Sequence, residues 1–480
     1  MSRERENFIL QTDSYKTSHW KQYPNDTQVV YSYLESRGGK WNDTVFFGLQ
    51  YILKHYFMDS LAGTGQVIYQ SNINKAEARI NAHMGPGTFN REGWQYIFDK
   101  YEGALPLSIW AVPEGTPVPN GHPLVVVYNT DPKCYWLTNY VETLLMQVWY
   151  PITVATQSRE MKQLILKYLK RTGDPSGIDF KLHDFGYRGV SSCESAGLGG
   201  CAHLVNFKGT DTMAALEIAR NYYGEEMAGF SIPAAEHSTI TSWGREHEDM
   251  AYRNMLDKFP TGLVAVVSDS YNIFEACRMW GHYPLRDRVQ ERDGTVVIRP
   301  DSGDPVQVLV AGNENVLDIL WEGFGGTVND KGYKVLNPKV RIIQGDGVDI
   351  KSIDSILYAM QRRGYSADNI AFGSGGALLQ RVDRDTLSMA FKCSAIQVAG
   401  KWHDVFKDPI TQHGKQSKRG QVMTFVTRES GSDKPRGFRT HDRTTSIETC
   451  WDCGMVEVFR NGRLLIDQPL SDIRERAACA

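Results

Sequence analysis

The sequence has no long apolar run and no marked excess of either charge. No stretch approaches the roughly 18 consecutive apolar residues that read as a membrane-spanning helix. The 53 Lys and Arg residues face 56 Asp and Glu residues, a net charge of -3, which gives no basic field for nucleic acid. The first ten residues, MSRERENFIL, are too charged for a secretory signal. We therefore expect a cytoplasmic protein with no membrane or nucleic-acid partner.

Motifs that hold metals are also missing. The 8 cysteines are scattered through 480 residues, which favours reduced thiols over a disulfide framework. Cys450 and Cys453 form a single CxxC, whereas a structural zinc needs about four ligands. His247 and Glu248 lack the second histidine of an HExxH motif. A zinc site held by the protein is not expected.

The composition that remains is that of a soluble globular protein. Hydrophobic residues make up 41% and charged residues 23%, which excludes wholesale disorder. A chain of 480 residues exceeds what one core usually supports, so we expect two domains. Residues 105–132 predict a small antiparallel sheet, and residues 135–171 a long helical stretch broken at Pro151. The domain boundary is expected near that break.

One pattern is repeated between residues 180 and 380: a short apolar run, a polar loop, and then a helix-like stretch. It occurs in FKLHDFGYRG (180–189), GLVAVVSDSYNIFEAC (262–277), VVIRPDSGDP (296–305), VRIIQGDGVD (340–349) and NIAFGSGGALLQ (369–380). Such runs are typical of buried parallel strands. They predict an α/β barrel or a doubly wound sheet, and in both the ligand binds where the loops converge.

Arginine, glycine and aspartate stand where these runs end. Arg188 and Arg299 offer the planar fork that suits phosphate oxygens. The GSGGA segment at 373–377 supplies amides that can approach a phosphate closely. Carboxylates that suit ribose hydroxyls or magnesium are present at Asp269, Asp301, Asp346 and Asp349. Together these groups predict a site for a sugar phosphate that carries a metal-bound diphosphate.

Each group also has a purely structural interpretation. A strand-end Asp often caps the next helix, an Arg can form an ion pair, and glycines commonly serve tight turns. The agreement of these loops favours a ligand site over the separate explanations.

The carboxy-terminal part differs in composition. Residues 401–446 are rich in Lys, Arg, Gly, Ser and Thr, and KQSKRG at 415–420 is locally basic. This segment is either a solvated loop or a loop that closes over phosphates. Residues 454–467 predict a hairpin that turns at Asn461-Gly462.

Eight motifs in one order resemble the nicotinamide phosphoribosyltransferase family of type II phosphoribosyltransferases. They are TDSYK (12–16), KLHDFGYRGVSS (181–192), HLVNFKGTDT (203–212), PAAEHSTIT (233–241), VVSDSY (266–271), IRPDSG (298–303), IQGDGVDI (343–350) and IAFGSGGALLQ (370–380). The resemblance implies transfer of phosphoribosyl from phosphoribosyl diphosphate to nicotinamide by a homodimer. It further implies an irregular α/β barrel over 151–395 and an α+β domain over 1–150 that residues 396–480 complete.

The resemblance also implies roles for particular residues. Phe185 is similar to the aromatic residue that stacks on the pyridine ring, with Tyr15 of the other subunit on the opposite face. Asp211 is similar to the carboxylate that accepts a hydrogen bond from the carboxamide. His237 matches a histidine that contacts diphosphate and is phosphorylated by ATP. Further substrate contacts are implied for Asp13, Arg188, Ser231, Arg299, Asp301, Gly345, Asp346, Gly375, Gly376, Arg384 and Lys392, with His237, Asp269, Arg299 and Asp301 as the catalytic set.

Two cofactors follow from the same resemblance. Magnesium is expected mainly on the diphosphate and water, near Asp269, and ATP is expected as a coupled activator. The basic segment at 415–419 is a further candidate for phosphate contacts.

The sequence departs from the family pattern at two places. Ala377 stands where another glycine is expected, and the segment from Gly38 to Asn42 is shorter than in vertebrate members. Two other functions stay open: a nicotinate phosphoribosyltransferase, which would have no reason to place Asp211 at a carboxamide, and a binding protein that keeps the fold without turnover.

Overall fold

The computed structural model describes residues 6–59, 63–408, 411, 417–428, 435–444 and 451–478. The chain forms two compact units. The first is built from residues 1–156, 221–225 and 383–478, and the second from residues 157–220 and 226–382. The expected boundaries at 150 and 395 therefore move to 156 and 382. The second boundary moves because strand β14 (Met389–Val398) pairs along β1 (Thr27–Ser36) in the first unit.

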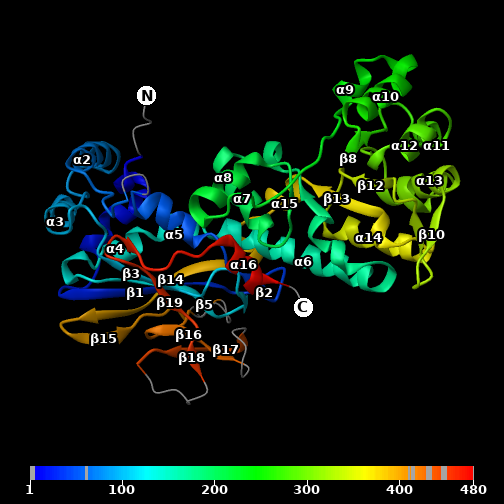
Figure 1. Ribbon diagram of the computed structural model, residues 1–480. Coiled ribbons are helices and arrows are strands. Elements are labelled where there is room, and N and C mark those ends of the chain that lie inside the picture. Colours follow the sequence, from blue (N-terminus) through cyan, green and yellow to red (C-terminus); the bar gives the residue numbers. More distant parts are fainter. Residues whose placement is uncertain are drawn as a thin grey trace. The chain divides into compact units, whose positions relative to one another are not determined.

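The first unit contains a seven-stranded antiparallel sheet in the order β15-β14-β1-β5-β3-β19-β20 (Figure 1). Its other strands are β3 (Leu107–Ala111), β5 (Pro123–Asn129), β15 (Lys401–Asp404), β19 (Val456–Arg460) and β20 (Arg463–Leu464). The antiparallel pairing of β3 with β5 confirms the sheet expected over 105–132. The hairpin expected at Asn461-Gly462 is also confirmed, since both residues have the positive φ of a tight turn, 47° and 79°.

Smaller elements complete the first unit. Its helices are α1 (Leu49–Ile52), α2 (Gln70–Met84), α3 (Arg91–Tyr101), α4 (Leu137–Tyr140), α5 (Glu142–Met146) and α16 (Leu470–Ala477), with 3-10 helices at Phe8–Leu10, Ser14–Lys21 and Pro132–Cys134 and a π-helical turn at Leu53–Phe57. Two small sheets pair β2 (Asp43–Val45) with β4 (Pro117–Pro119), and β16 (Val422–Arg428) with both β17 (Pro435–Asp442) and β18 (Asp452–Cys453).

Helix α6 (Trp149–Thr172) runs from the first unit into the second. Pro151 lies in its first turn, where a missing N–H costs nothing, so it begins this helix and does not break it. The interruption of the expected helical stretch falls just before, at residues 147–148 between α5 and α6. The prediction of a break at Pro151 was therefore wrong by a few residues.

The second unit is built on a six-stranded, entirely parallel sheet in the order β7-β6-β13-β12-β9-β8. The strands are β6 (Leu182–Asp184), β7 (Gly209–Thr210), β8 (Thr261–Val267), β9 (Asp293–Arg299), β12 (Val340–Gln344) and β13 (Ile370–Ser374). Phe230 forms a parallel bridge to Gly209 of β7, and Ala234 forms one to Ala265 of β8. The segment between these bridges joins the two edge strands, so the sheet closes into an irregular α/β barrel, as expected.

Helices follow the barrel strands. They are α7 (Cys193–Leu204), α8 (Met213–Tyr223), α9 (His237–Thr241), α10 (Glu248–Lys258), α11 (Ile273–Gly281), α12 (Leu285–Glu291), α13 (Val316–Phe324), α14 (Ile350–Arg362) and α15 (Gly376–Leu379), and β10 (Gly326–Val328) pairs with β11 (Lys334–Leu336). Helix α11 contacts both α12 and α13, and the three lie together in Figure 1. No helix in the described ranges is long and apolar enough to cross a membrane.

Candidate active site

The predicted site residues of the second unit lie just past the carboxyl ends of the barrel strands. Phe185 and Arg188 follow β6, Asp211 follows β7, Asp269 follows β8, Arg299 and Asp301 end and follow β9, Gly345 and Asp346 follow β12, and Gly375 and Gly376 follow β13. Because the strands are parallel, their carboxyl ends lie on one rim of the barrel. The fold therefore gathers residues that are up to about 190 positions apart in the sequence.

Phe185 packs against the barrel interior. Its ring contacts the buried cluster of Ala265, Val297 and Ile343. The ring also lies over Gly373, where an added Cβ would stand 1.9 Å from Phe185 Cε2. Only glycine fits at position 373, and the aromatic face is thereby fixed among the strand ends.

His237, Asp269, Asp301 and Arg299 form one connected polar group. His237 Nε2 lies 3.0 Å from Asp269 Oδ1, and the Asp301 N–H donates to Asp269 Oδ2 at 3.1 Å. Arg299 Nη2 lies 3.6 Å from Asp301 Oδ2. The Asp269 side chain is 3% exposed and that of His237 is 47% exposed. A buried carboxylate therefore orients an exposed imidazole.

The electrostatics of this group depend on three carboxylates. Burial raises the pKa of Asp301, and the charges of Asp269 and Asp346 raise it further, whereas Arg299 and His237 lower it. Arg299 Nε is buried and makes no hydrogen bond to the described part of the chain. Alternating carboxylates and a partly unsatisfied guanidinium suit a ligand that carries both hydroxyls and anionic oxygens.

Asp211 and Ser231 are brought together by the barrel closure. The Ser231 hydroxyl donates to Asp211 Oδ1 at 2.5 Å, and the Asp211 N–H donates to the Asp184 carbonyl at 2.9 Å. Asp211 Oδ2 has no hydrogen-bond partner in the residues that the structure describes. One oxygen is thus held in place and the other is available to an N–H of a ligand.

Arg188 and the glycine loop after β13 are neighbours. A Cβ on Gly189 would lie 3.4 Å from Gly376 Cα, and nothing lies within 4 Å of a Cβ at Gly376. Arg188 is exposed, and within the described ranges it has no ion-pair partner. Ala377 lies inside α15 without a positive φ, so the missing glycine leaves this loop undistorted.

One predicted carboxylate, Asp349, caps a helix. Asp349 accepts hydrogen bonds from the N–H groups of Lys351 and Ser352, and the Ser352 hydroxyl completes a capping box at the start of α14. Asp349 Oδ1 therefore serves the helix, and a contact of Asp349 with ribose or magnesium stays a prediction.

The remaining predicted residues belong to the first unit. Asp13 accepts a hydrogen bond from the Thr143 hydroxyl at 2.7 Å. Tyr15 is 57% exposed and lies edge-on to His19. Its neighbour Lys16 is buried and pairs with Glu142 at 2.6 Å. The backbone beneath Tyr15 is thus anchored while its ring faces outward.

Lys392 lies in a cluster of cations that sequence reasoning found only in part. Burial lowers the pKa of Lys392, and the charges of Arg37, Arg384 and Lys407 lower it further, opposed by Glu142. Arg37 directly follows β1, as Arg299 ends β9, and the rule that singled out strand-end arginines could have found it. Lys407 lies within the basic segment 401–446, but nothing in the sequence singled it out from the other cations there.

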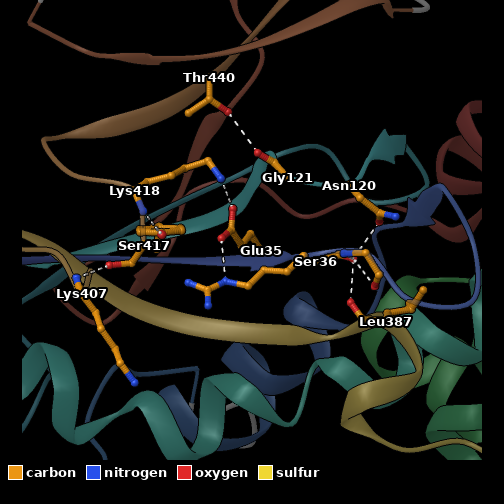
Figure 2. A network of polar contacts seen from close by, with 12 residues as sticks. Glu35, Ser36, Asn120, Gly121, Leu387, Lys407, Ser417, Lys418 and Thr440 are labelled. Carbon is orange, nitrogen blue, oxygen red and sulfur yellow. Dashed lines mark hydrogen bonds and ion pairs between the residues drawn. The ribbon is translucent and has the colours of Figure 1, made fainter. Parts of the chain in front are cut away.

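The expected phosphate-binding segment at 415–419 lies partly outside the described residues. Lys418 is described and forms an ion pair with the buried Glu35, whose other oxygen receives Arg37 Nε at 3.1 Å (Figure 2). The backbone N–H of Lys407 donates a hydrogen bond to the Ser417 hydroxyl, and the Lys407 side chain extends away from Ser417 (Figure 2). Within the described ranges the Lys407 ammonium has no ion-pair partner and is available to an anion, whereas Lys418 is paired with Glu35.

Possible metal ligands at the barrel rim are few. In the described parts of the chain, no three His, Cys, Asp or Glu side chains group as ligands. Both oxygens of Asp269 are engaged, by His237 and by the Asp301 N–H. A cation at this rim would thus meet Asp269 through water or through a bound anion. Cys453 has a free thiol, and Cys450 of the CxxC lies outside the described residues.

Asp184, the last residue of β6, is fully buried, and burial raises its pKa to about 6. The folded state holds this proton more tightly than the unfolded state, so unfolding becomes easier as pH rises from about 4 to about 6. The loss is on the order of 3 kcal/mol, the equivalent of a rise from 3.8 to about 6. Asp184→Asn should abolish it. Urea denaturation of both proteins from pH 4 to 8 checks this, and a stability difference that is independent of pH would contradict it.

Comparison with known proteins gives two family matches. The model described as "Nicotinate phosphoribosyltransferase (NAPRTase) family" matches residues 180–450, and the model described as "Nicotinamide phosphoribosyltransferase, N-terminal domain" matches residues 7–109. The chain is 51% identical over 479 residues to the nicotinamide phosphoribosyltransferase of Xanthomonas campestris, covering 99% of each chain. It is 32% identical to that of Acinetobacter baylyi, covering 97% of this chain and 96% of the relative.

Solved structures show the same fold at low sequence identity. The nicotinate-nucleotide pyrophosphorylase of Pyrococcus furiosus superimposes with a TM-score of 0.60 at 15% identity, covering 99% of this chain and 97% of that one. Human nicotinic acid phosphoribosyltransferase superimposes with a TM-score of 0.59 at 14% identity, covering 97% and 92%. These two likenesses support the fold of a barrel with an additional domain.

Proposed function

Because this chain belongs to the nicotinate phosphoribosyltransferase family, we propose that it transfers phosphoribosyl from phosphoribosyl diphosphate to nicotinamide, forming nicotinamide mononucleotide and diphosphate in NAD salvage. The observation that carries the choice of base is the Asp211 carboxylate, which Ser231 holds by one oxygen while the other is available. A carboxylate accepts a hydrogen bond from an amide NH2 and repels the carboxylate of nicotinate.

The mechanism follows from the charge that develops on the substrates. Breaking the bond between ribose C1 and diphosphate leaves cationic character on the sugar and negative charge on the leaving group. Arg188 and Arg299 supply positive charge for the diphosphate, and Asp301 and Asp346 supply acceptors for the ribose hydroxyls. The ring nitrogen of nicotinamide is a neutral nucleophile, so no general base is required, and positioning carries much of the catalysis.

Stacking on Phe185 would hold the pyridine ring in line with C1. Its ring is fixed by the barrel interior and by Gly373. We propose that a second copy of the chain covers the other face with Tyr15, whose exposed ring has an anchored backbone. The cluster of Arg37, Arg384, Lys392 and Lys407 would then supply contacts to a phosphate.

Magnesium would enter on the diphosphate. If bound there, the ion would supply positive charge that offsets the negative charge on the leaving group. Since Asp269 is engaged on both oxygens, it would face the ion through water, and its direct role would be to orient His237.

One assay tests the proposed function against its alternatives. Purified protein is incubated with magnesium, phosphoribosyl diphosphate and either nicotinamide or nicotinate, and both mononucleotides are quantified. Preferential formation of nicotinamide mononucleotide supports the proposal. Preference for nicotinate would identify the other pyridine as substrate, and absence of both products would identify a binding protein.

We further propose that ATP acts through His237. With Nε2–H donating to Asp269, Nδ1 keeps its lone pair and can attack the γ-phosphorus of ATP, releasing ADP and leaving a phosphohistidine. ATP is expected to lower the KM for the substrates severalfold, and His237→Ala should remove this gain. Initial rates with and without ATP measure it, and an undiminished ATP effect in the variant would refute the role.

A further inference from the structure

A single buried carboxylate lies between the two loops that would hold the base. Asp184 directly precedes Phe185, and its carbonyl accepts the Asp211 N–H at 2.9 Å. It also pairs across the ladder with Thr210, the residue before Asp211. A shift in the position of Asp184 would therefore move the backbone of both Phe185 and Asp211.

The Asp184 side chain collects donors from both loops. Oδ1 accepts the Gly186 N–H at 2.7 Å, on the Phe185 side. The hydroxyls of Thr210 and Thr212 face the same carboxylate and lower its pKa, against the larger effect of burial. The Thr212 N–H in turn donates to the Thr210 hydroxyl at 3.0 Å, so the backbone on both sides of Asp211 is tied to this carboxylate.

The Asp184 side chain is tightly packed by its neighbours. A Cβ at Gly200 of α7 would stand 2.9 Å from Asp184 Oδ2 and 2.7 Å from Ala215 Cβ. Oδ2 makes no well-aligned hydrogen bond within the described chain. The space around the side chain thus fits a group no larger than a carboxylate. The carboxylate present has little compensation for its charge at Oδ2.

Stability does not explain a carboxylate at this position. Burial disfavours the charged form, and the nearby Asp211 disfavours it further. An uncharged residue of the same shape would avoid both costs, and such costs are typical of residues kept for function. What an aspartate offers and an asparagine does not is a charged group without an NH2, facing the Gly186 N–H and two threonine hydroxyls.

We propose that Asp184 is a positioning residue for base specificity, which acts through Asp211 by fixing the GTDT turn at 209–212 so that Asp211 Oδ2 faces the substrate carboxamide. The proposal rests on the proposed function, because it assumes that Asp211 recognises the base. An asparagine would present an NH2 to one of the threonine hydroxyls and let the turn shift.

The test is the ratio of kcat/KM for nicotinamide to kcat/KM for nicotinate. Asp184→Asn is expected to lower this ratio about tenfold, with the KM for phosphoribosyl diphosphate unchanged. In an Asp211→Asn background, Asp184→Asn should lower it no further, because two residues that act through one contact are not additive. Thr212→Val, which removes one hydroxyl and no charge, should lower it about threefold and tests the proposal if Asp184→Asn fails to fold.

Glu217→Gln is the matched control. Glu217 is exposed on α8 and, in the described part of the chain, pairs only with Arg220 at 3.2 Å, so the same loss of charge should leave the ratio unchanged. An equal fall in kcat/KM for both bases, or an unchanged ratio in Asp184→Asn, would overturn the inference. Wild-type protein that makes no nicotinamide mononucleotide would instead overturn the proposed function.

Discussion

Arg299→Ala is expected to lower kcat about 10³-fold, the largest effect of any single substitution at the barrel rim. Arg299 ends β9 and its side chain is only 17% exposed. Among the residues that the structure describes, its sole ionic contact is Asp301 at 3.6 Å, longer than a good hydrogen bond. Its buried Nε has no partner in the described residues. A guanidinium held in this way is available to the departing diphosphate, and its contribution grows as charge develops.

Steady-state kinetics with saturating substrates measure this effect. Arg299→Lys should recover part of the activity, because an ammonium keeps the charge but not the planar fork. Arg278→Ala is a suitable control, since Arg278 is half-buried on α11 and pairs with Glu275 and Glu314 outside the rim. A loss of less than tenfold for Arg299→Ala would place the diphosphate elsewhere.

The barrel was predictable because its strands have a recognisable local sequence pattern. Each is a short apolar run that ends in Gly, Asp or Arg, and this pattern depends only on burial and on the polar loop that follows. Its closure was not predictable in detail. Phe230 and Ala234 join the edge strands through two isolated bridges, and a segment with so little ladder has no strand periodicity to detect.

Sequence order also concealed which residues share a unit. Residues 383–395 follow the barrel strands directly, yet β14 pairs with β1, more than 350 positions away. A pairing at that separation depends on tertiary contacts and leaves no local signal. The same limit applies to Asp184, which looks like an ordinary strand residue until its burial between Phe185 and Asp211 is known.

Asp211→Asn is expected to produce the largest change in substrate choice. A site built on a polar contact can discriminate by roughly 10⁴, and this substitution should reduce the preference for nicotinamide over nicotinate by about 10²-fold or more. The carboxamide of asparagine has the same shape, but its NH2 can donate to the nicotinate carboxylate that Asp211 repels. Competition between the two bases in one reaction gives the ratio directly.

Ser231→Ala separates the charge of Asp211 from its orientation. This variant removes the hydroxyl that holds Oδ1 but keeps the carboxylate, so the preference should fall less than in Asp211→Asn. If the ratio of kcat/KM for the two bases stays the same in Asp211→Asn, then repulsion at this carboxylate does not select the base. The remaining contact with the base, stacking on Phe185, treats both pyridines alike and cannot select between them. The case for nicotinamide as the preferred substrate would then fail.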